Sequence, residues 1–320
     1  MKKYFYSLLA AGMLFAASCS QEELVDVTQG EGQQKTFKVE LPGVQSRAIA
    51  ENTGLGSGKY ADKLICAMYE HGKDKALITK FVDESDREGV FEVTLPMANK
   101  KSYDILFMAY NPDNCAFVIN NTIAEKNNLR ALKLKTNLSA NQEQYDAFIG
   151  RIIEMDINST STTVTLSRPF NQVNVATTWD DLNAVNALQT EIAESDFMIT
   201  NAPDQLDIFD GSVSGSSVIR YAEGAILTKY DANAFPYNET ISVDGTVYYS
   251  LAMSYVLAGK EFSTHDVKFN FYTDDKLVSD LIVYGVPVKA NYRTNIVGTI
   301  LTQQQNYEVK INSNLSDNNF

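Results

Sequence analysis

Apolar and polar residues alternate through much of the first half of the chain, which predicts β-strands. The clearest case is the segment 36–41, where Phe37, Val39 and Leu41 are separated by single charged residues. A period of two residues is typical of a strand with one buried face. Clusters of turn-forming residues, such as 71–74, separate the apolar runs that follow. The pattern predicts strands over 36–41, 62–70, 76–82, 89–95, 102–110 and 162–167.

The second half of the chain combines strand patterns with one helical pattern. The helical pattern begins at Trp179 and is expected to run to about Ala193, with Thr178 as its N-cap. Asp180 and Asp181 fall in its first turn, where carboxylates favour the positive end of the helix dipole. Strands are predicted near 218–221, 247–256, 266–273, 279–284 and 307–311, and the segment 112–150 is the least legible.

The order of these elements predicts the fold class. Short strands separated by turns, with one good helix, favour a mainly β protein with two tandem transthyretin-like or Ig-like β-sandwich domains and one or two short helices. The 320 residues exceed one typical domain. We expect a signal segment over 1–19, a tether with the first strand over 20–59, an N-terminal domain over 60–165 and a C-terminal domain over 166–320.

The first twenty residues predict export. Two lysines precede a short apolar run over 8–17, which describes a secretory signal peptide. This run is shorter than the roughly 20 apolar residues that span a bilayer. The segment 16–19 resembles a bacterial lipobox, which makes Cys19 the expected lipidation site; an incidental cysteine is the alternative. The acidic pair at 22–23 resembles a surface-export signal of Bacteroidetes lipoproteins, or is simply the start of a polar tether.

Composition narrows the possible partners. The net charge of −13 and the isoelectric point near 4.7 would repel phosphate backbones, so we expect no nucleic-acid binding. Besides Cys19 the chain has Cys66 and Cys115, and the sequence leaves open whether these two pair. Cys66 lies in an apolar run and is interpreted first as a small core residue.

Motifs that carry catalysis are missing from the sequence. It contains no nucleophile elbow, phosphate-binding loop, dinucleotide fingerprint or zinc-protease motif, so we expect no enzyme, no cofactor and no metal. His71 and His265 are expected to be exposed turn residues. The acidic clusters 83–86 and 274–275 lack the ligand spacing of a calcium loop and are interpreted as solvated turns.

Several segments together resemble the fimbrillins of Bacteroidetes, which are subunits of type V pili. One is the lipobox at Cys19 followed by the first strand and by an arginine in a loose segment, Arg47. The segment 168–175 is similar to the strand that opens the second fimbrillin domain, and 290–298 with the following 301–302 is similar to the penultimate strand. The resemblance spans most of the chain. It implies a non-catalytic surface subunit that polymerises into, caps or anchors a pilus and has a role in adhesion.

The resemblance also implies a mechanism of assembly. In such pili a trypsin-like protease cuts after an arginine beyond the first strand, and a strand of the next subunit fills the groove that the removed strand leaves. Such an added strand would supply backbone hydrogen bonds and alternate side chains. An ordinary intramolecular edge strand is the alternative for each strand. The residues implied are Arg47 and Ala48 at the cut, Phe37, Val39 and Leu41 on the removed strand, and Tyr307, Val309 and Ile311 on the donor strand.

The partners implied are other fimbrillin subunits, the outer membrane through the lipid anchor before processing, and a host or bacterial surface ligand. The expected location is the outer cell surface, or an extracellular fimbria after processing. The alternative function is a glycan-binding surface lipoprotein of a polysaccharide-uptake system. That alternative predicts exposed aromatic platforms, whereas most aromatic residues here alternate within predicted strands.

Overall fold

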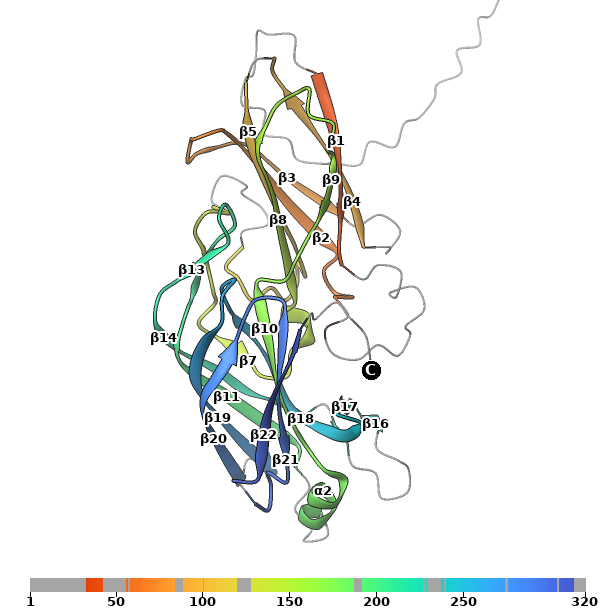
Figure 1. Ribbon diagram of the computed structural model, residues 1–320, viewed down its shortest axis with the longest axis vertical. Coiled ribbons are helices and arrows are strands. Elements are labelled where there is room, and N and C mark those ends of the chain that lie inside the picture. The colour runs from red at the N-terminus through yellow and green to blue at the C-terminus, as the bar shows by residue number, and fades with distance from the viewer. Residues whose placement is uncertain are drawn as a thin grey trace, which may run out of the picture.

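A computed structural model gives the fold of the chain. It describes residues 33–42, 56, 58–83, 89–99, 101–119, 128–186, 192–226, 228–229, 237–238, 240–273, 276–303 and 305–313. The body is elongated, with residues up to about 165 (the first half) at one end and the following residues (the second half) at the other (Figure 1). Strands dominate both halves, which confirms the predicted mainly β class with β-sandwich domains.

Two sheets pack face to face in the first half. One has the order β4-β1-β9 and the other the order β3-β2-β5-β8. An apolar cluster that includes Phe37, Cys66, Phe91 and Phe107 fills the space between them. The strands are β1 (Gln33–Glu40), β2 (Lys63–Glu70), β3 (Ala76–Asp83), β4 (Val90–Met97), β5 (Tyr103–Tyr110), β8 (Ala147–Met155) and β9 (Thr163–Thr165).

Both faces of the central strands β2 and β5 are covered, which explains their nearly continuous burial. Their second face carries Ile65 and Leu106, which belong to an apolar cluster that continues to Phe170 and Val173 in the second half. Two short strands also cross between the halves: β6 (Leu132–Lys133) pairs with β12 (Gln205–Asp207), and β7 (Leu138–Ser139) pairs with β14 (Ser217–Ala225). The two halves therefore share one continuous apolar cluster as well as backbone hydrogen bonds.

Two five-stranded sheets form the second half, with the orders β17-β18-β10-β21-β22 and β20-β19-β11-β14-β7. A smaller sheet has the order β13-β12-β6, and β15 pairs with β16. The strands are β10 (Phe170–Thr177), β11 (Glu194–Ala202), β12 (Gln205–Asp207), β13 (Ser212–Ser214), β14 (Ser217–Ala225), β15 (Thr228–Lys229), β16 (Tyr237–Asn238), β17 (Thr240–Val243), β18 (Thr246–Leu257), β19 (Ser263–Thr273), β20 (Lys276–Val288), β21 (Tyr292–Gly298) and β22 (Tyr307–Ser313).

The predicted helix is present but shorter than expected. α2 spans Trp179–Asn186, and the backbone amide of Asp181 donates to Thr178 Oγ1 at 3.3 Å, which confirms the predicted N-cap. Ile192 and Ala193 are not helical, so the helix does not reach Ala193, and residues 187–191 lie outside the described residues. The 3₁₀ turn η2 (Glu143–Tyr145) is a second helical element.

The structure places the two histidines differently from each other and shows that the two described cysteines do not pair. His265 lies on β19, is 7% exposed and hydrogen-bonds with Ser263 Oγ at 2.9 Å, so the expectation of an exposed turn is wrong for it. His71 does lie in a turn, with its Nδ1 2.8 Å from Asp104 Oδ1. Cys66 and Cys115 are both buried and unpaired, and Cys66 is a core residue as expected.

Candidate functional site

Strand β1 lies in the middle of its sheet. It pairs antiparallel with β4 from Gln33↔Met97 to Glu40↔Val90 and parallel with β9 from Lys38↔Thr163 to Glu40↔Thr165. The ladder extends to Leu41, whose amide donates to the Gly89 carbonyl at 2.8 Å. The alternative of an ordinary edge strand is therefore wrong for β1. Both β4 and β9 depend on it for hydrogen-bond partners (Figure 1).

The apolar side chains of β1 fill the first-half core. Phe37 and Val39 are 0% exposed, Leu41 is 2% exposed, and the Phe37 ring centroid lies 6.3 Å from that of Phe107. The charged residues between them face outward, where Lys38 Nζ lies 2.7 Å from Glu40 Oε1. Because exposed ion pairs contribute little, the apolar side chains and the backbone ladder hold β1 in place. Removal of β1 would open an apolar groove between β4 and β9.

Strand β22 is the edge of the β17-β18-β10-β21-β22 sheet and, among the described residues, pairs with β21 alone. Tyr307 and Val309 pack against the core of the second half, whereas Ile311 is 43% exposed. The apolar and charged residues of β22 alternate as they do in β1: Tyr-Glu-Val-Lys-Ile at 307–311 matches Phe-Lys-Val-Glu-Leu at 37–41. The chain therefore holds both a filled groove and an edge strand with the same pattern.

A buried charge cluster lies where the two halves meet. Arg168, just before β10, directs its Nε to both carboxylate oxygens of Asp146, at 2.8 and 2.9 Å. The Arg168 guanidinium also stands over the Phe148 ring, 4.4 Å from its centroid. Glu143 is the second carboxylate of the cluster and accepts a hydrogen bond from the Tyr255 hydroxyl at 3.0 Å. Sequence analysis missed this cluster, because its members become neighbours only through the fold.

The charge cluster forms hydrogen bonds with one glycine of the connection between β1 and β2. Gly56 donates its amide to Glu143 Oε1 at 2.6 Å and accepts from Arg168 Nη2 at 2.5 Å. Burial, together with the charge of Asp146, raises the pKa of Glu143 to about 8. Two residues further on, Gly58 has a φ of +68°, and a Cβ there would lie 2.6 Å from Phe148 Cζ. The connection is thus fixed at Gly56 and Gly58, whereas Cys19, Arg47 and Ala48 lie outside the described residues.

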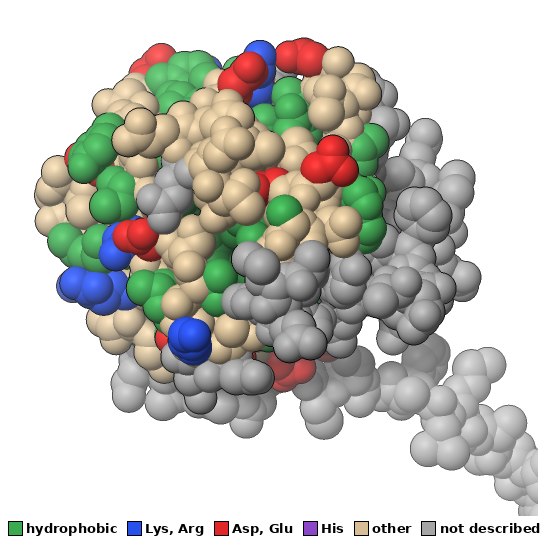
Figure 2. All heavy atoms as spheres, turned by 90° about the horizontal axis from the view of Figure 1, so that it is seen from below, with side chains coloured by type: hydrophobic (Ala, Val, Ile, Leu, Met, Phe, Trp, Pro, Cys, Tyr) green, Lys and Arg blue, Asp and Glu red, His purple; other side chains and the backbone are tan. Residues whose placement is uncertain are grey.

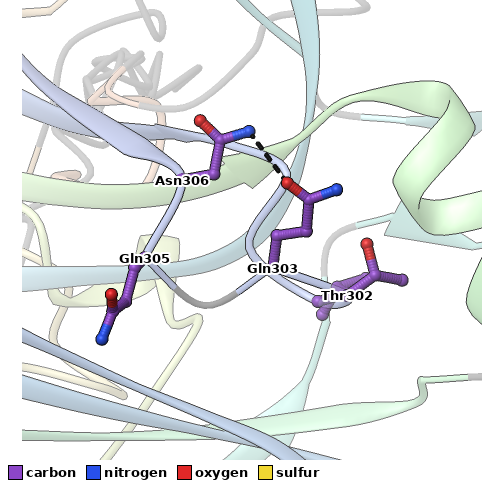
Figure 3. Close-up of a pocket in the computed structure, with 5 residues that line it drawn as sticks. Thr302, Gln303, Gln305 and Asn306 are labelled. Atoms are coloured by element: carbon purple, nitrogen blue, oxygen red, sulfur yellow. Dashed lines mark hydrogen bonds between the residues drawn. The ribbon is translucent and has the colours of Figure 1, made fainter.

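A polar hollow of about 590 Å³ lies at the turn between β21 and β22. Leu301, Thr302, Gln303, Gln305 and Asn306 line it, and Asn306 Nδ2 donates to Gln303 Oε1 at 3.4 Å (Figure 3). The surrounding end of the molecule, seen in Figure 2, carries uncharged polar and apolar side chains with scattered charges of both signs. The described side chains in this view therefore do not form a patch of a single charge sign.

The described residues carry neither a metal-binding cluster nor a membrane-spanning helix. Within them, no group of three His, Cys, Asp or Glu side chains is placed to hold a metal ion. The same part of the chain contains no helix that is long and apolar enough to cross a membrane. Its exposed aromatic residues are Phe262 and Tyr284, at 49% and 74% exposure, and Trp179 packs on Tyr249 at 5.3 Å between ring centroids.

Several solved structures match the chain at low sequence identity. A candidate polysaccharide-binding protein of Bacteroides thetaiotaomicron matches with a TM-score of 0.49 and 13% identity, over 87% of this chain and 95% of that one. A candidate cell adhesion protein of Bacteroides ovatus matches with 0.46 and 9%, over 88% and 97%. The fimbrial anchor protein Mfa2 of Porphyromonas gingivalis matches with 0.42 and 12%, over 88% and 98%. Identities this low transfer no residue roles.

Sequence comparison gives the family. No curated protein sequence matches the chain. One family model matches residues 27–320, which is nearly the whole chain after the predicted signal segment and includes β1, the charge cluster and β22. The chain therefore belongs to DUF6562, a family described as being of unknown function.

Proposed function

We propose that this chain is a non-catalytic, fimbrillin-like subunit of a cell-surface fibre that joins its neighbours by strand exchange. In this proposal the lipid on Cys19 first holds the chain at the outer membrane. A protease then cuts between Arg47 and Ala48, β1 leaves, and a strand of another copy takes its place. Adhesion to a host or bacterial surface is the role proposed for the assembled fibre, in which the chain is a polymerising, capping or anchoring subunit.

The observation that carries the proposal is the position of β1. A strand in the middle of a sheet, with three side chains in the core, leaves two unpaired strand edges and an apolar groove when it is removed. Burial of a side chain such as Phe37, Val39 or Leu41 contributes about 1.5–3 kcal/mol each. The groove is therefore expected to bind a strand with apolar residues at every second position. The 307–311 segment of β22 has this pattern.

The cut is needed because β1 is covalently attached to the domain that it completes. An attached strand has a high effective concentration, so a strand from another molecule cannot displace it efficiently. Cleavage at Arg47 would cut the connection between Leu41 and Gly56, which is held in the charge cluster. β1 would then be free to leave, while the rest of the domain keeps its fixed point at Gly56.

Intact mass and N-terminal sequencing of protein sheared from the cell surface test the proposal. The expected material is a high-molecular-weight polymer whose subunits begin at Ala48. An Arg47→Ala chain is the control and should remain monomeric and keep its N-terminal segment. Polymers whose subunits retain residues 20–47, or a wild-type protein that is only ever an acylated monomer, would rule out cleavage-dependent exchange.

A further inference from the structure

The C-terminal strand β22 is already in use within its own chain. Seven residue pairs join it to β21, from Tyr292↔Ser313 to Gly298↔Tyr307. Insertion of β22 between β4 and β9 of another molecule therefore requires its release from β21. The connection between β21 and β22 begins at residue 299, and its contacts oppose that release.

One buried carboxylate fixes this connection to the body of the second half. Asp181, in the first turn of α2, is 3% exposed. Its Oδ2 accepts from the Leu301 amide at 2.8 Å and from Thr177 Oγ1 at 2.5 Å. Its Oδ1 accepts from the Thr302 amide at 3.0 Å and from Thr302 Oγ1 at 2.5 Å. Each carboxylate oxygen thus receives two hydrogen bonds, and three of the four come from the β21–β22 connection.

The other described contacts of the connection are the burial of Ile300, which is 0% exposed, and neutral hydrogen bonds. Beyond Thr302 the side-chain hydrogen bonds of the described residues are neutral and exposed, such as the one from Asn306 Nδ2 to Thr299 Oγ1 at 2.5 Å. The turn is also tight, since a Cβ on Gly298 would lie 2.1 Å from the Asn306 carbonyl oxygen. Hydrogen bonds to charged groups are roughly twice as strong as those between neutral groups. Among the described polar contacts, those of Asp181 therefore contribute most to fixing the start of the connection to β22.

We propose that Asp181, Thr177, Leu301 and Thr302 form a clasp that controls the release of β22, with Asp181 as its positioning residue. While these hydrogen bonds are formed, residues 301 and 302 stay at a fixed position beside α2. β22 then pairs with β21 in the observed register, with Tyr307 opposite Gly298. When the clasp opens, the whole connection can swing and β22 loses its register with β21. The clasp is a property of the single chain; its use in assembly rests on the function proposed above.

The neighbouring residue supplies a matched control. Asp180 has the same side chain in the same helical turn but is exposed. Asp181→Asn replaces one acceptor oxygen with an NH₂ group that faces donors already in place, so it removes two hydrogen bonds and opposes like groups. Asp180→Asn makes the same change of charge next to the same helix terminus and leaves the clasp intact.

Hydrogen exchange measured by mass spectrometry on the uncut chain tests the clasp. We expect Asp181→Asn to speed exchange of the 307–313 amides at least tenfold, with β10 and β18 unchanged and Asp180→Asn equal to wild type. Unchanged exchange over 307–313, or equal acceleration in all strands of both sheets, would show that Asp181 does not control β22. If Asp181→Asn fails to fold, Thr302→Val, which removes one donor, should give a smaller rise in the same segment. No partner chain is involved, so this result and the surface-polymer result can fail independently.

Discussion

The Nε of Arg168 lies 2.8 and 2.9 Å from the two carboxylate oxygens of Asp146, and the two side chains are only 2% and 1% exposed. Asp146 immediately precedes β8 in the first half, and Arg168 precedes β10 in the second. The pair therefore ties the halves together at the point where Gly56 is held. Its value to the fold depends on both members, because a buried charge without a partner is costly.

Loss of either member of this pair should destabilise the whole chain. We expect Arg168→Met to lower the free energy of unfolding by about 3–5 kcal/mol, since Asp146 would be left buried and uncompensated. Chemical denaturation monitored by circular dichroism measures this. The exposed pair of Lys63 and Asp83, 3.0 Å apart, supplies the control, and Asp83→Asn should cost less than about 1 kcal/mol. Equal costs for the two substitutions would contradict the structural role of the buried pair.

Glu143 should make stability depend on pH near neutrality. Its pKa is raised by burial from an ordinary value of 4.5 to about 8 in the folded chain. A raised pKa means that the folded state favours the protonated form. The stabilisation is therefore complete below about pH 4.5 and is lost as the pH rises through 8.

A pH series of unfolding free energies checks this expectation. Relative to Glu143→Gln, which stays neutral, the wild type should lose stability between pH 5 and 8. Glu261→Gln, at an exposed position, should follow the wild type. A difference between wild type and Glu143→Gln that is constant over this range would show that Glu143 keeps an ordinary pKa.

A comparison of Gly58 and Gly72 separates the stability cost of a clash with Phe148 from the cost of a left-handed backbone. Gly58 and Gly72 both have positive φ, at +68° and +75°, but only at Gly58 would a Cβ meet a neighbour, Phe148. Alanine at either position pays about 1–2 kcal/mol for the left-handed backbone. Gly58→Ala should cost about 1–3 kcal/mol more in thermal or chemical unfolding because of the clash. Similar costs at both sites would mean that Phe148 does not fix the connection.

The side chains of β1 should hold the first half together before any cut. We expect Phe37→Ala to lower the unfolding free energy by about 3–5 kcal/mol, because it leaves a cavity against Phe107. Lys38→Ala, one residue away with an outward-facing side chain, should change it by less than about 0.5 kcal/mol. If the Phe37→Ala chain is as stable as the Lys38→Ala chain, Phe37 does not contribute to stability by filling the groove between β4 and β9.

The sequence predicted the strands well where a period of two residues ran for several residues. β1 was expected over 36–41 and spans Gln33–Glu40, because pairing with β4 extends the strand into polar residues that carry no apolar signal. β20 was expected over 279–284 and spans Lys276–Val288, since pairing with β19 carries it past Pro287. β6 and β7 are two residues long, too short for any period, and form only against strands of the second half.

The polar parts of the site were less predictable for a different reason. Arg168 belongs to a recognisable motif at 168–175, but its partner Asp146 lies 22 residues earlier in a segment without a clear pattern. Asp181 was predicted to favour the helix dipole, yet its main contacts are with Leu301 and Thr302, about 120 residues away. Such contacts are set by packing of the sheets, which alternation along a single chain does not reveal.

Disulfide trapping between copies tests the central claim, that the β1 groove accepts β22 of another molecule. Lys38 lies opposite Glu92 in the intact chain. In the proposed exchange, the apolar residues of β1 are replaced by Tyr307, Val309 and Ile311 of another copy. The residue that then takes the place of Lys38 is Glu308 for one direction of β22 and Lys310 for the opposite direction. Cys66 and Cys115 are buried, so cysteines introduced on the surface should react first.

The measurement uses Glu92→Cys combined with Glu308→Cys or with Lys310→Cys, in chains cut after Arg47 and then oxidised. We expect a ladder of disulfide-linked oligomers from one of the two double variants, and the variant that forms the ladder reports the direction of β22. Uncut chains, and cut chains with Glu92→Cys and Glu261→Cys, should give none. Cut and folded chains that form no ladder with either pair would contradict strand exchange through this groove.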